Sequence, residues 1–435
     1  MDAYHGRRTR VAAAIGDGVA VIPAARERLR SNDTDYEFRQ HSDFYYLTGF
    51  EEPDAVLVIA PHNERERMVA FVRPRDRSKE IWTGRRMGVQ AAPERLGVDA
   101  AYAIDELDTK LPELLYGARK LYYAFGHDEA FDRRMRDALA AAHAKARRAG
   151  RAPDETADPG AVLHEMRLLK DPDEIAKMRR AAQITQAGHL AGMRGTRPGM
   201  REFEIEALIE YEYLRAGATY AYPSIVAAGE NATILHYTSN RDELRDGDLL
   251  LVDSGAEFEL YTCDVTRTWP VNGRFTPEQR AIYEIVLAAQ EAGIEQVQPG
   301  NSCRAFHNAC TRVITEGLVD IGLLKGSVEE NLEKERYRDY YMHGAGHWLG
   351  LDVHDLGRYR NDDDAYRALE PGMVTTVEPG IYVHRDLDCD ERFKGIGVRI
   401  EDDIFVTASG NENLTGSIPK RIDEVEAITG AAALA

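Results

Sequence analysis

The stretch DLLLVDSGAEFELYTCDVTRTWPV, residues 248–271, decides the fold because it has the pattern of a buried β-hairpin that carries two carboxylates. An apolar run, Leu249–Val252, leads into Asp253, and a second strand pattern follows Asp264. A two-residue turn at positions 258–259 would place Asp253 directly opposite Asp264, with their Cβ atoms about 5 Å apart. Two buried carboxylates that close repel each other unless a proton or a cation lies between them. The hairpin therefore predicts a cation site.

A second pair of acidic residues repeats this pattern further along the chain. Glu378 ends the apolar run of VTTVEPGIYV, residues 374–383, and Glu401 lies in GIGVRIEDDIFV, residues 395–406. A lone buried glutamate is costly, and Arg399 is an alternative salt-bridge partner for either one. Two divalent cations neutralise all four carboxylates, so the full set favours a dinuclear metal site. Oxygen ligands with one imidazole suit Mn²⁺, with Co²⁺, Zn²⁺ or Fe²⁺ as competitors.

The segment MHGAGHWLGLDVHD, residues 342–355, supplies three histidines: His343, His347 and His354. Its H-x-x-x-H spacing is similar to the zinc-protease helix H-E-x-x-H, but position 344 is glycine, and three glycines make a poor helix interior. The acidic residues already provide most of a two-metal site, which needs one imidazole. The spacing alone leaves open which histidine that is.

The second part of the chain repeats itself. Residues 184–217 and 284–317 share one pattern, in which a helix ends at Pro-Gly (198–199 and 299–300) and a second helix follows. Each copy then leads to a histidine-bearing segment and to an apolar strand with a carboxylate. Matched order over such a length indicates a duplication. We therefore expect one domain of two related halves, with a site where they face each other.

Residues 1–160 alternate short apolar runs with helical segments, which indicates an α/β domain with a mixed sheet. The segment RRAGRAPDETADPG, residues 147–160, is rich in Pro, Gly and charge and is typical of a linker. Asp171 and Pro172 then fit the N-cap and the first position of a long helix. The sequence predicts an N-terminal domain at 1–160 and a second domain, which contains the predicted metal site, at 161–435.

Composition limits the function. A net charge of −19 argues against a nucleic-acid partner, whose backbone requires a basic surface. The apolar runs are all shorter than the ~20 residues that span a membrane. Four scattered cysteines do not form a disulfide framework. Cys303, His307 and Cys310 share one helical face and could bind zinc, but small buried core residues are the better explanation. We expect a cytoplasmic protein.

Four ordered motifs resemble the pita-bread metallopeptidases, the family of methionine aminopeptidase, prolidase and aminopeptidase P. The motifs are VDSGAEFELYTCDVTRTWPVNGRFT, HGAGHWLGLDVHD, TTVEPGIYV and GVRIEDD. RQHSDFYYLTGFEEPDAVLVIAP is similar to the amino-terminal domain of the aminopeptidase P (Xaa-Pro aminopeptidase) group. The resemblance covers nearly the whole chain. It implies a C-terminal pita-bread domain, in which an antiparallel sheet of two pseudo-symmetric halves is flanked by helices, after a smaller α/β domain with a mixed sheet.

The resemblance also implies roles for individual residues. Five of them match the family's ligands for two divalent metal ions: Asp253, Asp264, His347, Glu378 and Glu401. Another five match its substrate-binding positions: Tyr222, His236, His343, His354 and Trp82. In tetrameric relatives the aromatic at the position of Trp82 reaches the peptide of a neighbouring subunit, which implies a homo-oligomer, either a dimer or a tetramer.

The implied reaction is hydrolysis of the bond before a proline at position 2 of a peptide. A metal-bridging hydroxide would attack the carbonyl, and His354 would stabilise the oxyanion. Glu378 would carry the proton to the leaving nitrogen. His343 and His236 would orient the substrate, and Arg399 would hold Glu401 or its surroundings.

Two alternatives remain at this stage. A prolidase would cleave only Xaa-Pro dipeptides. A catalytically inactive binding protein could use the same fold without metal, but the presence of all five ligand residue types disfavours it.

Overall fold

The computed structural model describes residues 3–430. The chain forms two compact units, Met1–Met166 and Arg167–Ala435. The outermost residues of the two predicted domains, 1–2 and 431–435, lie outside the described part. Within residues 3–430, no helix has both the length and the apolar character needed to cross a membrane.

The first unit contains a six-stranded mixed sheet, as predicted. Its order is β6-β5-β4-β1-β7-β8. The pairs β1·β4 and β4·β5 are antiparallel, and the pairs β5·β6, β1·β7 and β7·β8 are parallel. The strands are β1 (Val19–Pro23), β4 (Val56–Ile59), β5 (Met68–Val72), β6 (Ala100–Ala103), β7 (Lys120–Tyr122) and β8 (Glu155–Ala157). A small ribbon is formed by β2 (Leu29–Ser31) and β3 (Thr34–Asp35).

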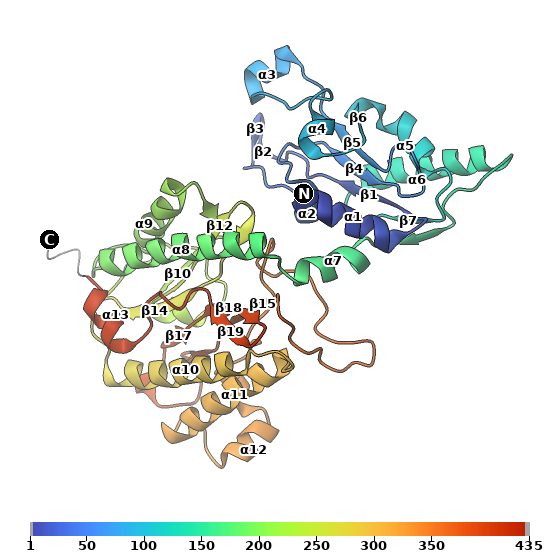
Figure 1. Ribbon diagram of the computed structural model, residues 1–435. Helices are drawn as coiled ribbons and strands as arrows, with labels where there is room; N and C mark the ends of the chain where they lie inside the picture. The colour runs from blue at the N-terminus through green and yellow to red at the C-terminus, as the bar shows by residue number, and fades with distance from the viewer. Residues whose placement is uncertain (1–2, 431–435) are drawn as a thin grey trace. The chain divides into compact units, whose positions relative to one another are not determined.

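Helices pack on this sheet through apolar faces. Leucines of α5 and aromatic and aliphatic residues of α6 join the strands in one buried core (Figure 1). The helices are α1 (Ala3–Ile15), α2 (Ser42–Thr48), α3 (Arg77–Thr83), α4 (Ala92–Leu96), η1 (Ile104–Glu106), α5 (Leu107–Leu115), α6 (Glu129–Ala146) and α7 (Gly160–Leu168).

The segment predicted as a linker contains a strand. Residues 155–157 form β8 at the edge of the sheet, paired in parallel with β7. The sequence of this strand lacks the apolar pattern that would predict a strand, since it contains Glu155 and Thr156, and both are exposed. An edge strand of this kind has one open side, so its sequence is polar and does not differ from that of a loop.

The second unit is built from two similar halves. In each half two consecutive helices precede a three-stranded antiparallel sheet, of order β10-β11-β14 in the first and β15-β18-β19 in the second. The first half has α8 (Pro172–Gly195), α9 (Glu202–Arg215), β10 (Ile225–Ala228), β11 (Leu249–Asp253) and β14 (Thr266–Pro270). The second has α10 (Pro277–Gln296), α11 (Cys303–Asp320), β15 (Val374–Val377), β18 (Asp402–Thr407) and β19 (Gly410–Asn413).

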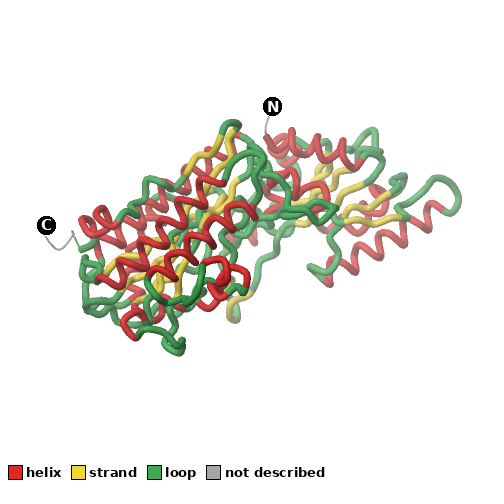
Figure 2. The backbone as a smooth tube through the Cα atoms, turned by 90° about the horizontal axis from the view of Figure 1, so that it is seen from below, coloured by secondary structure: helices red, strands yellow, loops and turns green. Residues whose placement is uncertain are grey.

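The two helix pairs cover opposite sides of the strands. Within this unit α8 and α9 lie on one side and α10 and α11 on the other (Figure 1). The tube view, seen from below, shows helices in front of the strands of this unit (Figure 2). The remaining elements are β9 (Thr219–Tyr220), η2 (Gly229–Thr233), β12 (Ala256–Phe258), β13 (Tyr261–Thr262), α12 (Val328–Glu333), η3 (Arg336–Asp339), β16 (Gly380–Tyr382), η4 (Glu391–Phe393), β17 (Gly397–Arg399) and α13 (Ile422–Ile428). This is the predicted pita-bread arrangement.

The first helix of each half starts in the same way. The Asp171 side chain accepts hydrogen bonds from the backbone N–H groups of Asp173 and Glu174, and Pro172 occupies the first helical position, as predicted. In the second half Thr276 caps α10 in the same manner, with Pro277 next. The duplicated pattern in the sequence therefore extends to the capping residues.

The predicted register of the hairpin is wrong. The turn falls at Glu259 and Leu260, both with positive φ of 48° and 61°, as a tight hairpin turn requires. In β11·β14, Asp253 pairs with Thr266, so Asp264 is not its cross-strand partner. The error is a shift of two residues, and because side chains alternate with a period of two, the carboxylates still face the same side.

Candidate metal centre

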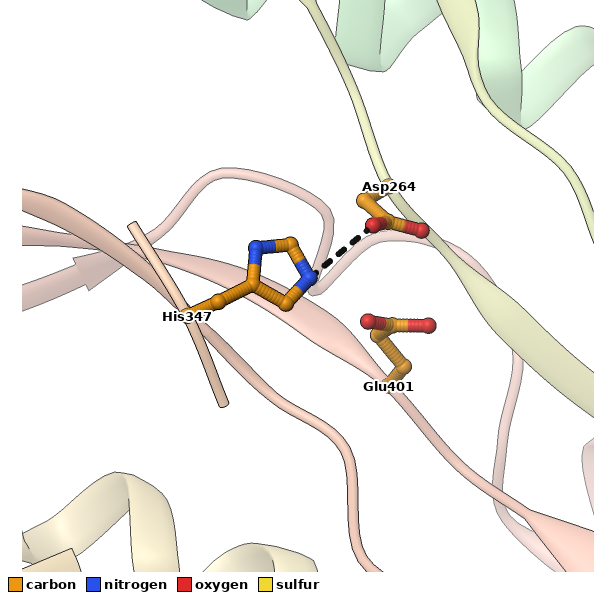
Figure 3. A group of neighbouring side chains, drawn as sticks. All are labelled: Asp264, His347 and Glu401. Carbon is orange, nitrogen blue, oxygen red and sulfur yellow. Dashed lines mark ion pairs between the residues drawn. The ribbon is translucent and has the colours of Figure 1, made fainter. Parts of the chain in front are cut away.

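Three predicted ligands converge from different loops. Atoms of Asp264, His347 and Glu401 that could each hold a metal ion lie within 4.8 Å of one another, and Figure 3 shows the three side chains turned toward one point. Asp264 follows β13, His347 belongs to the glycine-rich loop, and Glu401 directly precedes β18. The His347 Nε2 lies 3.3 Å from Asp264 Oδ2. The structure therefore brings both halves of the unit to one cluster.

The ring of His347 is oriented by its neighbours. Its backbone N–H donates to Thr376 Oγ1, and its Nδ1–H donates to the carbonyl of Trp348 at 3.0 Å. This leaves Nε2 facing the carboxylates. Burial opposes protonation of this ring, but the hydrogen bond to Asp264 and the charge of Glu378 raise the pKa of His347 to about 9. The carboxylates around Nε2 therefore favour a positive charge at this place.

Asp253 completes the acidic cluster from the end of β11. Its Oδ1 and Asp264 Oδ1 accept hydrogen bonds from one Tyr222 hydroxyl, at 2.6 and 2.5 Å. Its Oδ2 accepts from Arg399 Nη2 at 2.6 Å. Burial keeps the pKa of Tyr222 well above its usual value, so the residue remains a hydroxyl. The two carboxylates are therefore close together, although they are not cross-strand partners.

The two glutamates come from the second half. Glu378 follows β15, with Oε1 at 3.7 Å from His347 Nε2. Burial, reinforced by Asp264, raises the pKa of Glu378 to about 7. Glu401 Oε2 accepts a hydrogen bond from Thr266 Oγ1 at 2.7 Å, and burial and the neighbouring carboxylates hold its pKa well above the ordinary value.

The donor set fits a pair of divalent cations. Asp253, Asp264, His347 and Glu401 are each less than one-tenth exposed. The pKa values of Asp253, Glu378 and Glu401 are raised, first by burial and then by the repulsion of neighbouring carboxylates. Buried carboxylates that repel one another, beside an imidazole turned toward them, are the ligands that transition metals prefer.

The other predicted histidines lie around this cluster. The ring of His354 stacks on that of His347 at 3.9 Å between centroids. His343 donates its Nδ1–H to the Gly344 carbonyl, and its Nε2 accepts the hydroxyl proton of Tyr382 at 2.9 Å. Burial and the charge of Arg399 lower the pKa of His343 to about 3. His236 is exposed, and it is close enough to the rings of His343 and His354 to interact with them electrostatically.

Arg399 links the two halves. It belongs to β17 of the second half, and it forms its ion pair with Asp253 of the first half rather than with Glu401. Its Nη1 donates to Tyr382 at 3.0 Å and its Nε to Thr266 at 3.0 Å. Sequence reasoning did not predict Tyr382 or Thr266 as hydrogen-bond partners of Arg399. Thr266 was hidden by the wrong register, since it is the true pairing partner of Asp253.

Two glycines allow the ligand-bearing loops to touch. A Cβ atom on Gly255 would lie 1.7 Å from the Cys263 carbonyl oxygen, and one on Gly346 would lie 2.0 Å from that of Thr376. Gly255 follows Asp253 by two residues, and Gly346 precedes His347. Main-chain contact therefore sets the spacing of the ligands.

Three side chains considered in the sequence analysis, Trp82, Cys303 and Cys310, are not members of the metal cluster. Trp82 belongs to α3 of the first unit and is 86% exposed, and α3 has no buried residue. Cys303 and Cys310 are buried in the core of the second unit, on α11. This burial agrees with the expectation that they are core residues.

Comparisons with known proteins agree with this geometry. Residues 176–408 match the model of metallopeptidase family M24, and residues 4–123 match the N-terminal domain of aminopeptidase P. The chain is 48% identical over 415 residues to the Xaa-Pro aminopeptidase of Escherichia coli, covering 95% of this chain and 94% of that protein.

Solved structures extend the likeness to three dimensions. An aminopeptidase of Pseudomonas aeruginosa superposes with a TM-score of 0.97 at 45% identity, covering 99% of this chain and 98% of that chain. A zinc-substituted Escherichia coli aminopeptidase P in complex with product gives 0.95 at 46% identity, covering 99% and 98%. The fold, the domain models and the relatives agree, and the chain belongs to metallopeptidase family M24.

Proposed function

We propose that this hydrolase is a dinuclear metal-dependent aminopeptidase, which removes the N-terminal residue of peptides that have proline at position 2. The observation that carries the proposal is the convergence of Asp264, His347 and Glu401 within 4.8 Å, joined by Asp253 through the shared Tyr222 hydroxyl. The full-length relatives support the substrate class.

Five residues would hold two metal ions: Asp253, Asp264, His347, Glu378 and Glu401. When bound, these ions would supply Lewis acidity for a water nucleophile and for the substrate carbonyl. A carboxylate-rich set with one imidazole favours Mn²⁺, with Co²⁺, Zn²⁺ or Fe²⁺ as competitors.

The chain's own residues would move the proton and stabilise the transition state. Glu378 would accept the proton of the attacking water and pass it to the leaving nitrogen. His354, stacked on His347, would donate a hydrogen bond to the developing oxyanion. Arg399 would keep Asp253 in place.

The substrate side would be formed by polar groups around the cluster. His343 and His236 would orient the peptide, and Tyr222 would limit the space beside Asp253. Proline has a fixed φ and no N–H, so a pocket can select it by shape. We propose that Trp82, exposed on α3, reaches the peptide of a neighbouring subunit in a homodimer or homotetramer.

We also propose a cytoplasmic location. All four cysteines lie within the described residues and each is a free thiol. Free thiols are typical of a reducing compartment.

The test is a peptide-panel assay with mass spectrometry of the products. Matched Xaa-Pro and Xaa-Pro-Xaa peptides are supplied with Mn²⁺, Co²⁺, Zn²⁺ or Fe²⁺ after chelator treatment. The expected result is release of the first residue from the tripeptides, with Mn²⁺ giving the highest rate. Cleavage of the dipeptides alone would make the protein a prolidase, and no cleavage with any metal would overturn the proposal.

A further inference from the structure

A buried ionic cluster lies directly behind the metal ligand Glu401. Its centre is Asp402, which is fully buried. Five donors surround this carboxylate at 2.6 to 3.0 Å: Arg267 Nη2, Thr415 Oγ1, Gln290 Nε2, Asn413 Nδ2 and Lys420 Nζ. Charge-assisted hydrogen bonds of this kind are strong and directional, so the position of Asp402 is closely fixed.

The partners of Asp402 come from distant parts of the chain. Arg267 lies on β14 of the first half and Gln290 on α10 of the second. Asn413, Thr415 and Lys420 belong to the segment near the C-terminus. The cluster therefore ties the residue after Glu401 to both halves and to this terminal segment.

Arg267 connects the cluster to the main chain of Glu401. While its Nη2 donates to Asp402 at 2.6 Å, its Nη1 donates to the Glu401 carbonyl at 2.6 Å and to the Thr266 carbonyl at 2.9 Å. The backbone N–H of Glu401 donates to the same Thr266 carbonyl at 3.1 Å. Both backbone polar groups of Glu401 are thus fixed from one side.

The side chain of Glu401 is fixed by the same residues. The Thr266 hydroxyl donates to Glu401 Oε2 at 2.7 Å, and Thr266 is next to Arg267 on β14. The other carboxylate oxygen of Glu401, Oε1, does not take part in the hydrogen bond with Thr266. A ligand that is held at its main chain and at one carboxylate oxygen is ready to bind a metal ion without further ordering.

We infer that Asp402 is a positioning residue for Glu401, and that Lys420 and the segment 413–420 complete the metal centre through it. This inference rests on the proposed function, because it assumes that Glu401 binds metal. The inference assigns a role in metal affinity to the segment 413–420, which contains none of the predicted ligands.

The test compares Mn²⁺ binding by variants of the full chain, measured by calorimetry and by the rise in Tm that Mn²⁺ produces. Asp402→Asn is expected to bind Mn²⁺ about 10- to 100-fold more weakly, the range found for residues that orient metal ligands. Its kcat should recover in excess Mn²⁺ while KM for the peptide stays unchanged. Lys420→Met should show a smaller loss, and Lys420→Arg should restore affinity.

Glu202→Gln is the matched control. Glu202 is a fully buried carboxylate of the same unit, with four donors: the N–H groups of Ala228 and Asp242, the Asn231 amide and the Tyr237 hydroxyl. This variant is expected to lower Tm and leave Mn²⁺ affinity unchanged, as any variant with a purely structural effect would.

The outcomes separate the inference from the proposed function. Wild-type Mn²⁺ affinity in Lys420→Met, together with wild-type affinity in Asp402→Asn or failure of that variant to fold, would overturn the inference. A wild-type protein that neither binds Mn²⁺ nor cleaves peptides would instead overturn the proposed function. Weaker binding in Lys420→Met with rescue by Lys420→Arg supports the inference even if Asp402→Asn does not fold.

Discussion

The two halves of the second unit support their predicted metal ligands with different chemistry. Next to Asp253, hydrogen bonds between uncharged groups hold the main chain at Ser254. The His189 ring donates to the Ser254 carbonyl at 2.9 Å, and the Ser254 hydroxyl contacts the hydroxyls of Tyr213 and Ser224. Behind Glu401, the support is ionic and centres on Asp402.

The two supports are reached from matching helices of the duplicated fold. His189 lies on α8 and Gln290 on α10; His189 contacts Ser254, which directly follows β11, and Gln290 contacts Asp402, the first residue of β18. The residue numbers of His189 and Gln290 differ by 101 (290 − 189), the same offset as that between the two Pro-Gly pairs at 198–199 and 299–300. The difference teaches that a duplication can preserve where a helix supports a site while the supporting groups change from neutral to charged.

The largest expected effect comes from removing a predicted metal ligand that joins the halves. Asp264 belongs to the first half and contacts His347 of the second. Asp264→Ala should lower kcat/KM by roughly 1000-fold or more, since loss of metal chemistry costs several kcal/mol. Steady-state kinetics and bound-metal analysis measure this, with circular dichroism to show that the fold is retained. Near-normal turnover would mean that the metal site lies elsewhere.

A smaller effect is expected from weakening the link between the halves at Arg399. Its three nitrogens donate to Asp253, Thr266 and Tyr382, a geometry that a lysine ammonium cannot reproduce. Arg399→Lys should lower kcat by about 10- to 100-fold. Arg274→Lys, at an exposed ion pair with Glu426, is the control and should change little. Equal kinetics for the two variants would show that charge alone suffices at position 399.

The neutral support should make the first half sensitive to acid. Burial lowers the pKa of His189 from 6.5 to about 4. The neutral ring thus stabilises the fold fully above pH 6.5, and this contribution is lost as the pH falls from 6.5 toward 4, because the unfolded chain takes up the proton first. Between pH 7 and pH 5 the loss amounts to roughly 2 kcal/mol.

Urea unfolding at both pH values measures this loss. His189→Gln retains an amide donor for Ser254 and should show an acid-induced loss of stability smaller by that amount. The exposed His127→Gln is the control and should behave like the wild type. If the two variants lose the same stability between pH 7 and pH 5, protonation of His189 does not contribute.

The smallest effect is expected at Trp82, which lies outside both halves. Because its side chain is 86% exposed, Trp82→Ala should leave the unfolding free energy within about 0.5 kcal/mol of wild type. We expect a rise in KM of a few fold for proline peptides, with kcat/KM and light scattering as the measurements. An unchanged KM in an intact oligomer would remove Trp82 from the substrate site.

Sequence patterns predicted the architecture better than the register. Apolar runs, caps and the repeat at Pro-Gly gave the mixed sheet and the two halves, because these signals are local. The hairpin turn was misplaced because its positive-φ residues are Glu259 and Leu260, neither of which favours the left-handed region as Gly or Asn does. A turn without its usual residues leaves no local signal.

Other features depended on partners far apart in the chain. Asp402 is followed by another aspartate in an acidic run, and nothing local indicates that Arg267 and Lys420 neutralise it. The sequence analysis did not predict the helix that carries Trp82, although Asp76 caps this helix by accepting from the Ser78 N–H. That D-x-S pattern was the available signal. The roles assigned to the individual site residues remain predictions.

The contacts at Gly255 and Gly346 have a consequence for transplanting this centre. A designer who grafts only the side chains of the five predicted ligands onto another scaffold copies their directions but not the distance between their loops. That distance depends on two places where one main chain touches another with no room for a methyl group. A successful graft therefore also has to carry these two glycines, although neither of them is a predicted ligand.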